Sequence, residues 1–221
     1  MAESGFAVCG WFTPDYLKWV PRLGESLQSH GVEHIDFRKV QKEPGERWET
    51  STLRKAREVQ RAMQRHQDKT IIFLDVDSEV HGSLEPLVAS VHADVGLFIC
   101  VKRRRNGDVN WSVRSSTLVL RPTPGALDFV RNWVFQCEMA PLGSVDQDAM
   151  LFAMGQTSTC SFQTIAPEFC AVASDGIEDA IIRHDSASAG IAKISNLARR
   201  LHFQGAPMWL VDRMPAKRSG V

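Results

Sequence analysis

Short apolar runs alternate with stretches of helical periodicity in the first third of the chain. The pattern predicts strands at residues 6–12, 34–37 and 71–74. Between them, apolar side chains recur at helical spacing over 16–28 and from Ser51 or Thr52 to about His66, and residues 41–51 are expected to be a loop. This order of elements favours an α/β fold, and the uninterrupted run at 71–74 is typical of a strand buried in a parallel sheet.

The remaining chain carries weaker patterns. They predict strands at 94–101 and 116–120, a polar hairpin-like stretch at 102–110, helices at 126–137, 146–154 and 191–202, an irregular region at 156–174 and a frayed tail at 215–221. No linker separates these elements. We therefore expect residues 1–221 to form one α/β domain, with a nucleotide-binding half at about 1–100 and an acceptor half at about 101–205.

The charge balance narrows the function classes. Lys plus Arg and Asp plus Glu each number 26, which argues against a surface dedicated to nucleic acid or anionic lipid. A basic run at Arg103–Arg105 fits either a solvated loop or a basic loop that meets an anionic acceptor. Five scattered cysteines, no signal peptide and no apolar segment near the ~20 residues of a membrane span predict a reducing, cytoplasmic setting.

The sharpest candidate for chemistry follows the predicted strand at 71–74. Asp75 and Asp77 stand at its carboxyl end, the edge where open α/β sheets bind ligands. Strand alternation would send both side chains to the same side, where two carboxylates suit a hard divalent cation. The alternative is an acidic turn that merely ends a strand.

Several segments together resemble a known family. The sequence IIFLDVDSEVHGSLEPL at 71–87 resembles the Asp-x-Asp segment of GT-A-fold glycosyltransferases. DQDAM at 146–150 resembles the Asp-Gln pair that opens a helix in that group, and Trp48 and Lys55 fall where the group has an aromatic residue and a lysine ahead of the metal motif. The resemblance covers most of residues 6–154.

The resemblance implies a GT-A-like single domain with a Rossmann-like, mostly parallel central sheet flanked by helices. It implies a metal-dependent glycosyltransferase that moves a sugar from a nucleotide-diphosphate sugar, with a UDP-sugar as the expected donor and retention as the expected outcome. The acceptor stays open: a glycan, a small molecule, a protein or a modified nucleic acid base.

The resemblance also implies roles for single residues. Asp75, Asp77 and His184 would hold Mn²⁺ or Mg²⁺; Thr13, Tyr16, Asp36, Lys55 and Asp75 would bind the donor; Asp146, Gln147 and Lys193 would be catalytic. Two alternatives stay open. One of Asp146 and Asp148 is expected to do no more than complement the helix dipole, and His184 can instead be a buried histidine satisfied by hydrogen bonds.

Two rival interpretations differ in class. A haloacid dehalogenase-type phosphatase would use Asp75 as its nucleophile and Asp77 as its general acid, but Glu79 stands where that class usually has Thr or Val. A non-catalytic nucleotide-sugar-binding module would keep the same acidic positions without turnover. Two roles are equally expected for Trp111: stacking on a sugar or acceptor, and packing in the core or against the hairpin.

Overall fold

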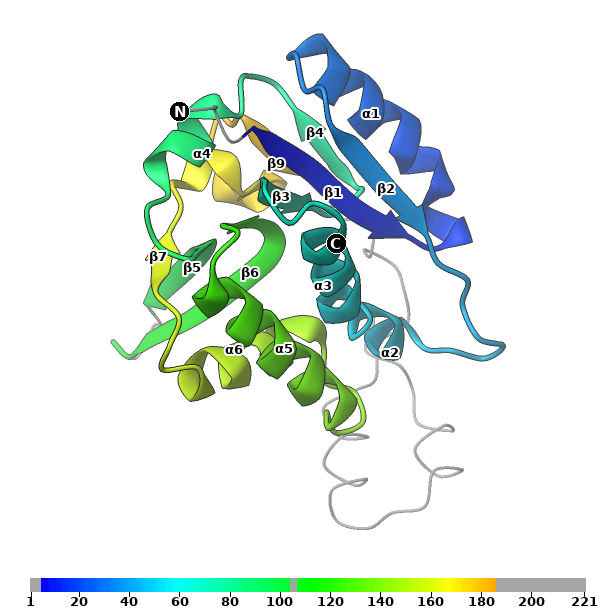
Figure 1. The fold of residues 1–221 in the computed structure, drawn as a ribbon, viewed down its shortest axis with the longest axis vertical. Helices are drawn as coiled ribbons and strands as arrows, with labels where there is room; N and C mark the ends of the chain where they lie inside the picture. The colour runs from blue at the N-terminus through cyan, green and yellow to red at the C-terminus, as the bar shows by residue number, and fades with distance from the viewer. Residues whose placement is uncertain (1–4, 104–106, 186–221) are drawn as a thin grey trace.

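A six-stranded sheet lies at the centre of the computed structural model, which describes residues 5–103 and 107–185 (Figure 1). The strand order is β2-β1-β3-β6-β5-β7. β6 alone runs antiparallel to its two neighbours, and the other pairs are parallel. The bounds are β1 Phe6–Phe12, β2 Ile35–Lys39, β3 Thr70–Leu74, β5 Val95–Arg103, β6 Val109–Leu120 and β7 Phe162–Thr164. The predicted mostly parallel α/β sheet is confirmed.

The two innermost parallel strands form because their side chains are apolar on both faces. All five residues of β3 are buried, and Val8 of β1 lies opposite Ile72 of β3. Along β1, Ala7 and Cys9 pack into the core on one face of the sheet while Val8 packs into the core on the other. A strand covered on both faces must lie inside a layered fold.

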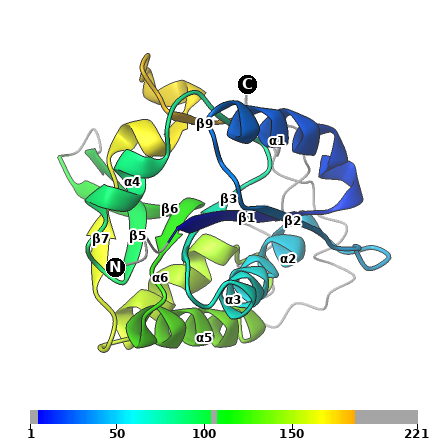
Figure 2. The ribbon, with the colours of Figure 1, turned by 45° about the horizontal axis from the view of Figure 1, so that its top comes forward.

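Helices cover one face of the sheet and a mixed layer covers the other (Figure 2). α3 (Lys55–Arg65), α5 (Pro124–Glu138) and α6 (Asp146–Gln156) pack on the face that carries Phe73, where Phe129 and Trp133 fill the core. α1 (Val20–Ser29) and α4 (Glu85–Ser90) pack on the face that carries Ile72. The six-stranded sheet therefore draws strands from both predicted halves of the chain.

A second, three-stranded sheet joins the segment after β3 to the end of the described chain. β4 (Ser78–Val80) pairs antiparallel with β9 (Ile182–His184), and β8 (Ala171–Val172) pairs parallel with β9. Two 3-10 helices, η2 (Pro167–Phe169) and η3 (Ala173–Asp175), flank β8. The region 156–174, expected to be irregular, thus contains β7 and β8, and the short pairing sets His184 opposite Ser78.

Two predicted helices are split. Instead of one helix over 16–28, the chain forms the 3-10 helix η1 (Pro14–Trp19) and then α1, because Pro21 has no N–H to continue the hydrogen bonding. The second predicted helix begins earlier, as α2 (Trp48–Thr52), and restarts as α3. The end of the predicted loop at 41–51 is therefore helical.

The predicted helix at 191–202 and the tail at 215–221 lie outside the described residues. None of the helices in the described ranges has the length and apolar character that a bilayer span requires.

Candidate functional site

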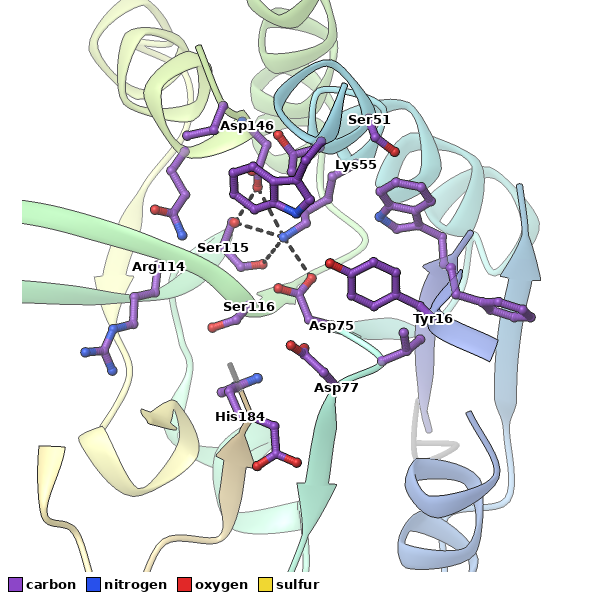
Figure 3. A pocket seen from close by; sticks show the side chains of 18 of the residues that line it. Tyr16, Ser51, Lys55, Asp75, Asp77, Arg114, Ser115, Ser116, Asp146 and His184 are labelled. Carbon is purple, nitrogen blue, oxygen red and sulfur yellow. Dashed lines mark hydrogen bonds and ion pairs between the residues drawn. The ribbon is translucent and has the colours of Figure 1, made fainter. Parts of the chain in front are cut away.

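A cleft of about 400 Å³ opens where β1 and β3 end (Figure 3). On one side its wall is formed by the end of β1, η1, α2 and the start of α3. The turn after β3, the middle of β6, the start of α6 and the end of β9 complete the wall. Segments more than 100 residues apart in the sequence therefore meet around one cavity.

A buried lysine links the two acidic segments of the cleft. Nζ of Lys55 lies 2.7 Å from Oδ1 of Asp75 and 3.2 Å from Oδ2 of Asp146, and it donates to Oγ of Ser115 at 3.0 Å. Ser115 in turn donates its hydroxyl to Asp146. Burial alone would lower the pKa of Lys55, but the charges of Asp146 and Asp75 outweigh burial and hold the pKa above its ordinary value. Lys55 is therefore a permanent cation.

Asp75 and Asp77 both line the cleft, as the sequence predicts, but not by strand alternation (Figure 3). β3 ends at Leu74, and the two aspartates belong to a turn in which the N–H of Ser78 donates to the carbonyl of Asp75 at 3.1 Å. The side chain of Asp75 is 30% exposed. The turn, rather than the pleat, presents both carboxylates to the cleft.

His184 lies deep in the cleft wall, and hydroxyl groups contact both of its ring nitrogens. Nδ1 is 2.7 Å from Oγ of Ser78, and Nε2 is 2.8 Å from Oγ1 of Thr117. Burial, together with the charges of Lys55 and Arg114, lowers the pKa of His184 to about 3, so the imidazole is neutral at ordinary pH. A neutral imidazole can ligate a metal, but here ligation requires that one of these hydrogen bonds be exchanged for the ion.

Oxygen donors suited to a divalent cation are present in the cleft. Asp75 and Asp77 offer carboxylates, the ligand type that Mn²⁺ and Mg²⁺ prefer, and Lys55 occupies only Oδ1 of Asp75 at 2.7 Å. Within residues 5–103 and 107–185, however, Asp75, Asp77 and His184 do not bring one ligand atom each within 4.8 Å of one another. The two aspartates fit a cation, and His184 would need to move to join them.

An aromatic pair forms the wall of the cleft next to β1. Tyr16 and Trp48 both line the cavity, and the side chains of the two residues are hydrogen-bonded. Burial raises the pKa of Tyr16, and the nearby charges of Asp77, Asp15 and Asp75 raise it further, so the phenol stays protonated. Figure 3 shows the phenol pointing toward the two carboxylates.

Of the other predicted donor-binding residues, one lines the cleft and one does not. Thr13 is 3% exposed, lines the cleft, and donates its hydroxyl to Asp15, which pairs with Lys42 at 2.6 Å. Asp36 is absent from the lining. Its carboxylate pairs with Arg65 at 2.8 Å on the face of the sheet that α3 covers, because Phe37, not Asp36, packs on the opposite face.

The structure distinguishes the roles of Asp146 and Asp148 at the start of α6, which the sequence leaves open. Asp148 accepts a hydrogen bond from the backbone N–H of Val145 at 3.1 Å and so caps the helix. Asp146 is 4% exposed and turns toward Lys55 and the cleft, with Gln147 beside it in the lining. Lys193 lies outside the described residues.

Arg114 is a cleft residue that sequence reasoning missed. It donates to both carboxylate oxygens of Asp175 and, at 2.8 Å, to the carbonyl of Cys170, and its guanidinium lies 5.1 Å from the centre of the Phe98 ring. These contacts fasten the segment around β8 to β6. The available signal was the run of four polar residues at 114–117, directly before the apolar residues 118–120.

Comparison with known proteins gives structural matches only. No protein-family model matches the sequence, and no curated protein does. A glycosyltransferase involved in the glycosylation of the major capsid of PBCV-1 aligns with TM-score 0.59 at 14% identity, over 90% of this chain and 99% of that one. The glycosyltransferase GlyE of Streptococcus pneumoniae TIGR4 aligns with TM-score 0.58 at 11% identity, over 97% of this chain and 66% of that one. The chain has the GT-A fold.

A third structure with the GT-A fold extends over nearly the same length. The galactosyltransferase LgtC, solved with donor and acceptor sugar analogs, aligns with TM-score 0.53 at 12% identity and covers 97% of this chain and 98% of its own. Identities this low establish the architecture. The chemistry of this GT-A chain must be argued from its own cleft.

Proposed function

We propose that the protein is a metal-dependent glycosyltransferase that transfers a sugar from a nucleotide-diphosphate sugar, with a UDP-sugar as donor, to an acceptor. One observation carries the proposal: in a GT-A fold, Asp75 and Asp77 follow the central strand β3 and both line the cleft at that strand's carboxyl end. Ligands of open α/β sheets bind at this edge.

Asp75 and Asp77 are proposed to hold Mn²⁺ or Mg²⁺, with His184 as a third ligand after it gives up one of its hydroxyl partners. A bound divalent cation neutralises the negative charge that develops on the diphosphate as it departs. Lys55 sets the position of Asp75 in this scheme, since the two groups are 2.7 Å apart. Its fixed positive charge also offsets the repulsion between the carboxylates of Asp75 and Asp146.

The nucleoside is proposed to lie against Thr13, Tyr16 and Trp48. An aromatic wall with a phenol and an indole gives a base a flat apolar contact, and the protonated phenol can donate to ribose or phosphate. Asp36 is left out of this set because its carboxylate is paired with Arg65 outside the cleft.

The sugar and the acceptor are proposed to lie against the start of α6. Asp146 has its carboxylate fixed by Lys55 and Ser115, which suits binding of sugar hydroxyls better than proton transfer. Gln147 is uncharged and lines the cleft next to it, so it can position a reacting sugar without becoming a base. We therefore keep retention, the outcome that the family resemblance implies, as part of the proposal.

The test is a donor screen with UDP-, GDP- and CDP-sugars in Mn²⁺ or Mg²⁺, measuring release of the nucleoside diphosphate. We expect release from one donor class only with metal, and at least a hundredfold loss in Asp77→Ala. Asp148→Ala is the matched control, because this nearby acid caps α6 and is outside the cleft lining. Release of inorganic phosphate from phosphomonoesters, without nucleotide release, would instead support the phosphatase.

A further inference from the structure

Three potential metal ligands meet on the far side of the sheet from α1. One ligand atom each from Cys9, Asp36 and His66 lies within 4.8 Å of the other two, and this is the only such trio among the residues that the structure describes. None of the three lines the cleft, so the cluster is separate from the proposed donor site.

The fold explains why these residues meet. Cys9 of β1 and Asp36 of β2 are direct partners in the parallel ladder, so their side chains stand next to each other on one face. Cys9 belongs to the core beneath α3. His66 is the C-cap of α3 and reaches the same point, with Nε2 at 3.2 Å from Oδ2 of Asp36. Three separate elements therefore each contribute one side chain.

The donor set is that of a zinc site. A thiol sulfur, an imidazole nitrogen and a carboxylate oxygen are the three ligand types that Zn²⁺ uses. Cys9 is 1% exposed, whereas the side chains of Asp36 and His66 are 24% and 20% exposed, so the cluster is closed on the core side and open to water on the other. A fourth ligand position is thus accessible to solvent.

Charged groups beside the cluster show what must move. Arg65 holds Asp36 at 2.8 Å, but its side chain is 62% exposed and can turn into solvent. Asp36 also lines a small cavity of about 20 Å³ together with Cys9 and Glu58. Glu58 is also buried, but its carboxylate is already paired with Arg61 at 2.6 Å and with Arg38 at 3.4 Å. The negative charge that faces an incoming cation therefore comes from the thiolate of Cys9 and the carboxylate of Asp36.

We propose that Cys9, Asp36 and His66 bind one Zn²⁺, with water as the fourth ligand. On binding, the thiol of Cys9 gives its proton to solvent and its sulfur bonds to the ion, a ring nitrogen of His66 donates its lone pair, and Asp36 exchanges Arg65 for the metal. The ion ties β1, β2 and the end of α3 together. We assign the ion no part in the proposed sugar transfer, because none of the three ligands lines the cleft.

The experiment uses the full chain, freed of metal, and titrates it with Co²⁺ and Zn²⁺ in an Asp77→Ala background that removes the proposed donor-site metal. We expect Co²⁺ to give a sulfur-to-cobalt charge-transfer band in the near ultraviolet, and Zn²⁺ to displace it at one equivalent. Cys9→Ser and His66→Asn should each abolish the band and weaken Zn²⁺ binding by more than about 100-fold, beyond the loss typical of an outer-shell partner.

The matched control is Cys137→Ser, a buried cysteine in the same core cluster that should keep the band. Zn²⁺ should also raise the melting temperature of the Asp77→Ala protein and of the control but not of His66→Asn, which tests the site even if Cys9→Ser does not fold. Absence of the band in the Asp77→Ala protein, or a band that persists in both ligand variants, would overturn the proposal. Either result would leave the glycosyltransferase proposal standing.

Discussion

Nζ of Lys55 lies 2.7 Å from Oδ1 of Asp75, so the helix that precedes β3 supplies the cation for the carboxylate that follows it. The same ammonium reaches Asp146 at 3.2 Å, and both it and that carboxylate are nearly excluded from water. One buried positive charge therefore fixes the turn after β3 against the start of α6.

Removal of this cation should destabilise the folded protein. Lys55→Met leaves the buried carboxylate of Asp146 and the partly exposed one of Asp75 without their shared cation, and loss of one partner from a buried pair typically costs about 3–5 kcal/mol. The control is Arg57→Met, whose partner Glu138 forms a pair in which both side chains are more than half exposed, so its cost should stay below about 1 kcal/mol. Urea denaturation measures both. Equal costs would show that the Lys55 network is not a stabilising feature.

Substitutions of the two acids at the start of α6, Asp146 and Asp148, should have different effects. Asp148→Ala removes the bond to the N–H of Val145 and should cost about 1 kcal/mol of stability with nucleotide release unchanged. Asp146→Asn should instead reduce release by at least tenfold, because it removes the charge that faces Lys55 and the cleft. Denaturation curves and initial rates of nucleotide release are measured for both variants. Equal losses of rate in the two variants would contradict this account.

The buried imidazole of His184 should make stability depend on pH in the acid range. Its pKa is about 3 in the folded protein and near its ordinary value of 6.5 in the unfolded chain, so the unfolded state binds one more proton between these values. The contribution of neutral His184 to the unfolding free energy is complete above about pH 6.5. It is lost as the pH falls toward the pKa of the folded state, at up to about 1.4 kcal/mol per pH unit.

His184→Gln cannot take up this proton. Between pH 7 and pH 5, the unfolding free energy of the wild type should therefore fall by about 2 kcal/mol more than that of the variant, measured by urea denaturation with a chelator present. Parallel pH profiles for the two proteins would show that the imidazole is not held neutral by the fold.

Gly10 of β1 should be intolerant of any side chain because of what lies beside it. A Cβ there would come within 2.7 Å of the carbonyl oxygen of Leu74, the last residue before Asp75. Gly10→Ala should therefore cost about 1–3 kcal/mol and disturb the turn that carries the aspartates. Gly24→Ala in α1 meets nothing within 4 Å and should be neutral or stabilise by up to about 1 kcal/mol. Equal changes in melting temperature for Gly10→Ala and Gly24→Ala would contradict this prediction.

The sequence contained enough to predict the central sheet but not the second one. β1 and β3 are continuous apolar runs, and burial on both faces leaves such runs few alternatives to a parallel sheet. β8 and β9 have two and three residues, too few for a periodic pattern, and they form because distant segments pair, as Ser78 does with His184.

The residues of the candidate site were likewise only partly predictable from the sequence. Local sequence indicated Asp75 and Asp77, since they stand at the end of a recognisable strand, and the family resemblance added Asp146. It did not reveal which face of β2 carries Asp36, because that depends on which side of the sheet Phe37 packs, and the structure places Asp36 beside Arg65. The contact between Lys55 and Asp146 joins residues 91 positions apart and follows only from the packing of α3 and α6 around β6.

The central claim is that Asp75 and Asp77 hold a cation that in turn holds a diphosphate. Isothermal titration of UDP into the protein, with Mn²⁺ and then with a chelator, tests it most directly, with Asp77→Ala and the capping control Asp148→Ala alongside. We predict binding to the wild type and to the control that weakens at least tenfold without Mn²⁺, and no metal dependence in Asp77→Ala. Metal-dependent UDP binding that survives in Asp77→Ala would contradict the account.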